Sequence, residues 1–110
     1  METLKNDMLT VEVSRAGAEL QSIRKGDTEY LWQGDPAYWG RRSPVLFPIV
    51  GSVWEKKYRV DGKEYELGQH GFARDMVFEL GSSSETEARY RLGSTEQTKS
   101  RYPYDFVLEI

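Results

Sequence analysis

Apolar and polar residues alternate along much of this chain, and that period of two limits what it can fold into. Leu9, Val11 and Val13 alternate with Thr10 and Glu12. The same alternation recurs at residues 76–80, 88–92 and 106–110. Because successive side chains of a strand point to opposite faces of its sheet, this pattern predicts β-strands with one buried face. The fold class is therefore predicted to be all-β.

Two further stretches predict strands, and each contains a residue that shapes a turn or an irregularity. Asp61 and Gly62 separate two alternating runs in residues 58–67, which predicts a hairpin with a two-residue type I′ turn. Residues 45–50, VLFPIV, are apolar throughout and predict a strand covered on both faces. Pro48 has no backbone N–H, so a bulge or an irregular end is expected there.

Helix is expected only in short pieces. Residues 94–101 begin with Ser94 and carry Gln97 three positions later, which is the pattern of a helix capping box. Pro103 is expected to end that helix. With 110 residues and no linker composition, the chain is predicted to form a single β domain over residues 1–110.

Composition excludes several classes of partner and site. The net charge is −3 and no run of Lys and Arg exceeds two residues, so neither nucleic acid nor a membrane surface is an expected partner. One histidine and no cysteine leave too few donors for an expected metal site. No apolar run approaches about 18 residues and no cleavable signal pattern is present, which with the lack of cysteine favours a cytoplasmic protein.

The single histidine lies in the stretch GQHGFARD, residues 68–75. The glycines on either side of it allow unusual backbone conformations and permit close approach of a ligand. We expect Gln69, His70 and Arg74 to project on the open side of this turn, with Asp75 pairing with Arg74. The alternative is that His70 is a packing or turn residue, and the residues by themselves leave both interpretations open.

Two adjacent arginines, Arg41 and Arg42, precede the apolar stretch 45–50. A guanidinium next to a core strand needs a partner, because an unpaired buried charge is expensive. These residues form either a donor fork for hydroxyl, carboxylate or phosphate oxygens or a surface pair that flanks a strand, and both interpretations stay open. The three tryptophans can stack on the C–H faces of a sugar ring, although most aromatic side chains fill the core.

Two motifs and the hairpin between them resemble a known family. RRSPVLFPIVG at 41–51, the Asp-Gly hairpin and ELGQHGFARD at 66–75 resemble, in that order, the N-terminal part of the aldose 1-epimerase (galactose mutarotase) family, in its LacX-like branch. The resemblance covers essentially the whole chain. It implies an antiparallel β-sandwich of which this chain is the N-terminal portion, and a hexose or hexose 6-phosphate whose α and β anomers are interconverted by acid/base ring opening without a cofactor.

The resemblance also implies roles for particular residues. By position, His70 matches a catalytic histidine that donates to sugar oxygens, and Arg41 and Arg74 match arginines that bind the substrate. Gln69, beside the histidine, is expected to bind the substrate as well. Arg42 is the alternative to Arg41, because the register of the motif is uncertain by one position there.

The chain departs from the family downstream of the histidine motif. The family's second histidine, its acid, and its glutamate base lie further along the sequence, and these 110 residues contain no second histidine. The isolated chain is therefore expected to be inactive as an isomerase. The alternative function is a non-catalytic carbohydrate-binding or structural half-domain that needs a partner chain, with a possible homodimer through the C-terminal strand, 106–110.

Overall fold

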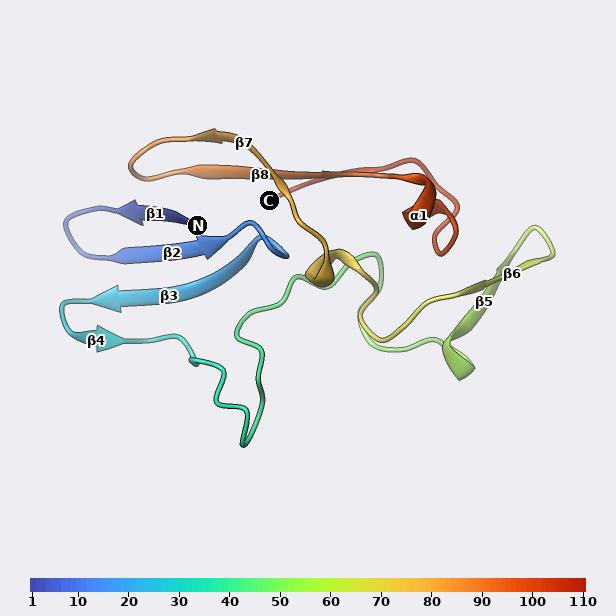
Figure 1. Cartoon of the computed structure of the whole chain (residues 1–110), viewed down its shortest axis with the longest axis horizontal. Coiled ribbons are helices and arrows are strands. Elements are labelled where there is room, and N and C mark those ends of the chain that lie inside the picture. Colours follow the sequence, from blue (N-terminus) through green and yellow to red (C-terminus); the bar gives the residue numbers. More distant parts are fainter.

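The structure, a computed structural model, describes all of residues 1–110 and consists almost entirely of short strands (Figure 1). The strands are β1 (Glu2–Lys5), β2 (Thr10–Ser14), β3 (Glu19–Lys25), β4 (Thr28–Glu29), β5 (Lys57–Val60), β6 (Lys63–Glu66), β7 (Glu79–Ser83), β8 (Ala88–Gly93) and β9 (Val107–Glu109). The helical elements are the 3₁₀ turns η1 (Trp54–Lys56) and η2 (Ala73–Asp75) and the single α-helix α1 (Glu96–Lys99).

The strands form three sheets, and every pairing within them is antiparallel. Their orders are β1-β2-β3-β4, β5-β6 and β7-β8-β9. The β5–β6 hairpin projects on the side opposite the four-stranded sheet (Figure 1). The prediction of an all-β, antiparallel fold is therefore confirmed.

The alternation pattern does not predict the strand β3, because a buried serine hides its period. Ser22 is buried, and its hydroxyl donates to a carboxylate oxygen of Glu29. The other oxygen of Glu29 accepts from the backbone N–H groups of Ile23 at 2.8 Å and Leu31 at 3.0 Å. These bonds lower the pKa of Glu29 from 4.5 to about 2, and the bond from Ser22 has the largest effect. One carboxylate thus closes the β3–β4 turn.

The core is small and lies between the four-stranded sheet and the β7–β9 sheet. Its buried cluster consists of Val13, Ala18, Ala73, Phe78, Tyr90 and Leu92. Ala73 belongs to η2 and is completely buried, so the core fixes the segment that carries the histidine. The hydroxyl of Tyr90 also donates to Glu2 across 2.7 Å, and Arg15 donates to the other oxygen of that carboxylate at 2.8 Å. Burial and the bond to Glu2 raise the pKa of Tyr90.

The molecule is thin for its length. The Cα atoms span 54 × 35 × 15 Å with a radius of gyration of 16.3 Å, whereas a compact domain of this length has a radius of about 13 Å. Only 11 of the 110 residues are buried, and many apolar side chains lie at the surface. No helix has the length and apolar character needed to cross a bilayer.

The hairpin predicted for residues 58–67 is confirmed. Its two turn residues have positive φ, 50° at Asp61 and 77° at Gly62, as a type I′ turn requires. Tyr58 and Tyr65 face each other across the two strands, with ring centroids 5.7 Å apart.

The prediction of a strand at 45–50 is wrong. This segment forms only an isolated bridge between Phe47 and Gly71, contains a cis Phe47–Pro48 peptide, and leaves Val50 77% exposed. Its apolar character reflects aromatic packing instead, because the Phe47 ring contacts those of Phe72 and Phe106. The segment therefore supports the histidine turn rather than extending a sheet.

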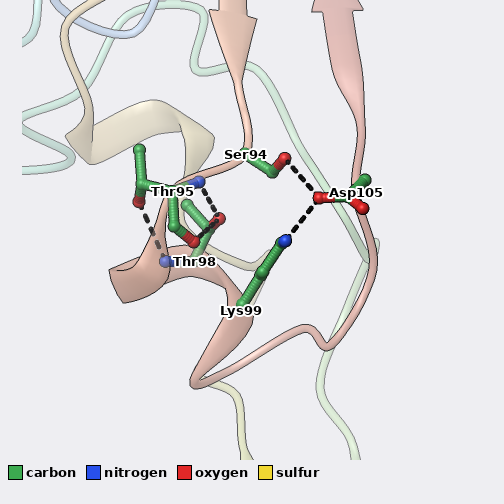
Figure 2. A network of polar contacts seen from close by, with 5 residues as sticks. All are labelled: Ser94, Thr95, Thr98, Lys99 and Asp105. Carbon is green, nitrogen blue, oxygen red and sulfur yellow. Dashed lines mark hydrogen bonds and ion pairs between the residues drawn. The ribbon is translucent and has the colours of Figure 1, made fainter.

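The helix predicted at 94–101 is shorter, and its N-cap lies one residue later than predicted. Thr95 is the N-cap of α1 and forms a reciprocal capping box with Thr98 (Figure 2). Ser94, the predicted cap, instead lies 3.4 Å from Asp105, which also pairs with Lys99. The sequence pattern favours Ser94 with Gln97, whereas the observed box uses a threonine hydroxyl at Thr98, which that pattern does not include.

Two strand predictions are correct in pattern and shifted in extent. In 76–80, Phe78 is 1% exposed and Val77 is 72% exposed, although the strand β7 begins only at Glu79. In 106–110, the strand β9 covers the middle three residues, and two backbone hydrogen bonds join Ile110 to Tyr90.

Candidate functional site

His70 occupies a backbone conformation that few residues other than glycine adopt. Its φ is 60°, and Gly71 follows with φ 71°. A Cβ on Gly71 would lie 2.2 Å from the carbonyl oxygen of Phe47, far inside van der Waals contact. That same oxygen accepts from the backbone N–H groups of Phe72 at 3.0 Å and Ala73 at 3.2 Å. The two-residue left-handed turn therefore sits directly on the segment that contains Phe47.

The imidazole of His70 is held by the backbone of Gly51. The N–H of Gly51 donates to Nδ1 of His70 at 2.8 Å, and the N–H of His70 donates to the carbonyl of Gly51 at 2.8 Å. A backbone amide can only donate, so Nδ1 must carry the lone pair and the neutral ring must carry its proton on Nε2. The free edge of the ring is thus a hydrogen-bond donor.

His70 lines a pocket of about 380 Å³ whose lining contains both apolar and polar side chains. The lining residues are Trp39, Pro44, Leu46, Gln69, His70 and Arg74. Its size lies in the range of pockets for single small molecules. The predicted residues Gln69, His70 and Arg74 are therefore brought together at one cavity, as expected of the turn.

Arg74 is tied to the turn but keeps unused donor capacity. Its Nη2 donates to the carbonyl of Gln69 at 3.0 Å, and its Nε is buried without a hydrogen-bond partner. A buried donor without a partner costs free energy, so Arg74 is held in this position at some cost by the packing around it.

The expectation that Asp75 forms an ion pair with Arg74 is wrong. Asp75 pairs with Arg41 instead, with 2.9 Å between Oδ1 and Nη2. The reason is the turn η2, which holds the Arg74 side chain against the backbone of Gln69. Neither Arg41 nor Asp75 lines this pocket, and Asp75 lines a separate cavity of about 210 Å³.

Arg42, the alternative to Arg41, has a different position. Its Nη1 donates to the carbonyl of Gln21 at 2.7 Å and to Oε1 of Gln33 at 3.0 Å. These bonds join the chain before the 45–50 stretch to the strand β3. Arg42 therefore fastens a loop.

Several residues that build the site carry no individual signal in the sequence. These are Pro44 and Leu46, which line the pocket, and Gly51, which binds the imidazole. Trp39 is one of the three tryptophans that can stack on a sugar ring, whereas the bond from Gly51 depends on a contact over 19 positions and has no local signature.

Other pockets lie elsewhere in the molecule. A larger pocket of about 550 Å³ is lined by residues of η1, β6 and the segment after α1, but its lining contains neither the histidine nor the arginines of the predicted site. No group of three or more His, Cys, Asp or Glu side chains is placed to hold a metal ion.

The fold and pocket together define an antiparallel β protein with a cavity of about 380 Å³ at a histidine turn. The sequence model of the family "Aldose 1-epimerase" matches residues 2–110. The chain belongs to the aldose 1-epimerase family.

Known relatives are longer than this chain. The chromosomal and plasmid LacX proteins of Lactococcus lactis subsp. lactis are each 37% identical to this chain over an alignment 114 residues long. The alignment covers 97% of this chain and 38% of each LacX protein. The chain thus spans less than half the length of the curated relatives that it matches.

Solved structures of mutarotase-like proteins contain the same arrangement. A galactose mutarotase related enzyme from Lactobacillus acidophilus superposes with a TM-score of 0.96 at 42% identity, over 98% of this chain and 37% of its own. A galactose mutarotase-like protein from Lactobacillus casei gives a TM-score of 0.95 at 33% identity, over 99% and 38%. The predicted mutarotase-like fold is confirmed by these likenesses.

Proposed function

We propose that the histidine pocket binds a hexose and forms the donor side of a mutarotase site, in which α and β anomers interconvert by ring opening. The observation that carries this proposal is the state of His70, whose Nδ1 accepts from Gly51, so that Nε2 is left as a donor in a pocket that Arg74 also lines. Both groups donate, and sugar oxygens accept. Family membership supports the same chemistry.

Anomer exchange needs a base and an acid. The base takes the proton of the anomeric O–H, the bond from C1 to the ring oxygen breaks, and the acid delivers a proton to that oxygen. Rotation about C1–C2 and the reverse steps give the other anomer. His70 and Arg74 are placed to bind the sugar and to stabilise negative charge as it develops on an oxygen.

The pocket lacks the group that would remove the anomeric proton. None of its six lining residues is a carboxylate, and Nδ1 of His70 is already an acceptor for Gly51. The activity of a whole mutarotase site thus requires a base that these six lining residues do not supply. We propose that the chain by itself binds the sugar and turns it over little.

A neutral hexose fits this site better than a hexose 6-phosphate. A phosphate calls for concentrated positive charge, as two arginines together supply. Arg41, however, is neutralised by Asp75 at 2.9 Å, which leaves Arg74 as the one guanidinium on the pocket wall. We therefore propose a free hexose as the substrate class, with Arg41 paired to Asp75 outside the pocket lining.

Magnetisation-transfer NMR on glucose, galactose and glucose 6-phosphate tests this proposal. Sugar resonances should show contact with the protein, and anomer exchange should stay near the buffer rate. Exchange far above that rate by the unmodified chain, unchanged in His70→Asn, would overturn the role given to the histidine.

A non-catalytic carbohydrate-binding domain is the second candidate, and the missing carboxylate favours it. Added acetate separates the two. If the pocket is the donor side of a catalytic site, an exogenous carboxylate should accelerate exchange in the presence of the chain more than in buffer, and His70→Asn should abolish that gain. A pure binding domain gives no such gain.

A homodimer through the C-terminal strand also stays a proposal, as does a cytoplasmic location. The strand β9 lies at the edge of its sheet, so one side of it has no strand neighbour and can pair with a second copy. Sedimentation at several concentrations measures this directly, and a single monomeric species throughout would contradict it.

A further inference from the structure

Four aromatic side chains lie exposed on one loop next to the pocket. This aromatic loop, residues 30–40, contains Tyr30, Trp32, Tyr38 and Trp39, all of them exposed. Single exposed aromatics are ordinary, but a group of them beside a cavity indicates a binding surface. Such a surface is useful to a ligand only if something other than these rings holds the loop in place.

A close backbone contact between Gly34 and Gly40 brings two parts of the aromatic loop together at its neck. Gly34 has φ +74°, and a Cβ there would lie 2.9 Å from the carbonyl oxygen of Gly40. Inside the neck, the backbone N–H groups of Tyr38 and Trp39 both donate to the carbonyl of Asp35, at 3.0 and 2.9 Å. The loop is therefore a compact turn with a defined path.

Polar bonds fasten the loop to the strand β3. Oε1 of Glu19 accepts from the backbone N–H groups of Arg42 at 3.0 Å and Ser43 at 2.9 Å. Arg42 in turn donates to Gln21 and Gln33, and Gln33 also donates to the carbonyl of Gln21 at 3.0 Å. The loop is thus ordered by polar bonds in which the indole of Trp39 takes no part.

One of these rings is placed at the sugar pocket. Trp39 is 50% exposed and lines the cavity together with His70 and Arg74. Its carbonyl accepts from Nε1 of Trp32 at 2.8 Å, and Tyr38 packs edge-on against Trp32 with ring centroids 6.1 Å apart. Trp39 is therefore held through its backbone while its indole remains available.

We propose that Trp39 is the stacking residue of the site, against which the C–H face of a pyranose ring lies while His70 and Arg74 bind its oxygens. A pyranose has hydroxyls around its edge and C–H groups on its faces, which match the polar and apolar side chains that line the pocket. An indole offers a wide rigid surface at low cost in side-chain entropy. The inference rests on the proposed sugar binding and adds selectivity for ring sugars over open-chain polyols.

The experiment compares three variants with methyl β-galactopyranoside and galactitol as probes. The glycoside has a ring but no anomeric hydroxyl, so binding is measured separately from exchange, and galactitol has the hydroxyls without the ring. Trp39→Ala is the test and Trp39→Phe the conservative variant. Trp54→Ala is the matched control, since Trp54 is 86% exposed and lies outside the pocket.

The readout is the indole N–H resonances of the protein and the C–H resonances of the sugar. We expect the Trp39 signal to shift on titration, the sugar C–H protons to move upfield under the ring current, and Trp39→Ala to weaken binding about tenfold. Trp39→Phe should lie between, and Trp54→Ala should bind like the unmodified chain. Galactitol should bind the unmodified chain and Trp39→Ala with equal weakness.

Two results would overturn the proposal, and they differ in what else they overturn. If the glycoside binds Trp39→Ala as well as it binds the unmodified chain while His70→Asn loses it, the sugar site stands and the stacking role is wrong. If the glycoside binds no form of the protein, the stacking role and the proposed sugar binding are both wrong.

Discussion

His70 and Gly51 are joined by two hydrogen bonds that run in opposite directions, each 2.8 Å long. One is a backbone bond that fixes the turn, and the other ends on Nδ1 of the imidazole. The same contact therefore sets the position of the histidine and the nitrogen that keeps its proton. Substitutions at position 70 can separate these two effects.

His70→Asn should preserve the stability of the fold and abolish sugar binding. Asparagine tolerates positive φ, and its Oδ1 can accept from Gly51 as Nδ1 does, but it has no donor at the position of Nε2. His70→Ala should lose both, with a decrease of about 2 kcal/mol in unfolding free energy from the strained φ and the unpaired amide. Urea denaturation and sugar NMR measure the two properties. Equal stability of the two variants would contradict the role of Nδ1.

Gly71→Ala should destabilise the chain by about 3 kcal/mol, because it combines a strained φ with a steric clash. The new Cβ would meet the Phe47 carbonyl at 2.2 Å. Gly62→Ala is the matched control, since Gly62 also has positive φ and a Cβ added there would have nothing within 4 Å. It should cost about 1 kcal/mol. Similar losses in urea denaturation would show that the contact with Phe47 is unimportant.

Asp75→Asn should improve the binding of hexose 6-phosphate by about threefold to fivefold and leave neutral hexose unaffected. The substitution frees the Arg41 guanidinium, which Asp75 now neutralises. Asp105→Asn is the control, because it removes an equal charge from an exposed pair with Lys99. Titrations by NMR at low salt measure both ligands. No gain for the phosphate, or the same gain in the control, would argue against neutralisation of Arg41 as the reason for a preference for neutral sugars.

Glu29 should make stability depend on pH in the acid range. Its pKa is lowered to about 2 by the bond from Ser22 and the backbone bonds, so its stabilising effect is present above the ordinary value of 4.5 and is lost as the pH falls toward 2. Glu29→Gln should flatten this part of the profile, and Glu66→Gln, a change on an exposed strand position, should not. Thermal melts between pH 2 and 6 measure this, about one melt per half unit. A Glu29→Gln profile parallel to that of the unmodified chain would contradict the assignment.

The sequence predicted those parts of the fold that local patterns encode. The hairpin at 58–67 follows from Asp61 and Gly62, whose backbone preferences act within the turn itself. The alternation pattern does not reveal the strand β3, because Ser22 occupies a buried position where alternation predicts an apolar residue. The hydrogen bond to Glu29 satisfies the buried hydroxyl of Ser22. Patterns of hydrophobicity do not contain such a compensation.

The sequence predicted which turn residues lie at the pocket better than it predicted which side chains bond to one another. Local sequence brings Gln69, His70 and Arg74 together, since all three lie on one turn. The partner of Asp75 and the difference between Arg41 and Arg42 depend on contacts over 34 and 21 positions. Neither adjacent arginine differs from the other in its local pattern, so only the three-dimensional arrangement separates them.

The thin shape of the molecule also determines how it opens. The single buried cluster joins the first sheet to the third and includes no residue of the β5–β6 hairpin. Elements outside a shared core unfold locally at lower free energy than those within it. Amide hydrogens of Lys57–Val60 and Lys63–Glu66 should therefore exchange with solvent in a separate and faster opening event, while those of β2 and β8 exchange together. The histidine turn lies between these two cooperative units, tied through Ala73 to the slower one.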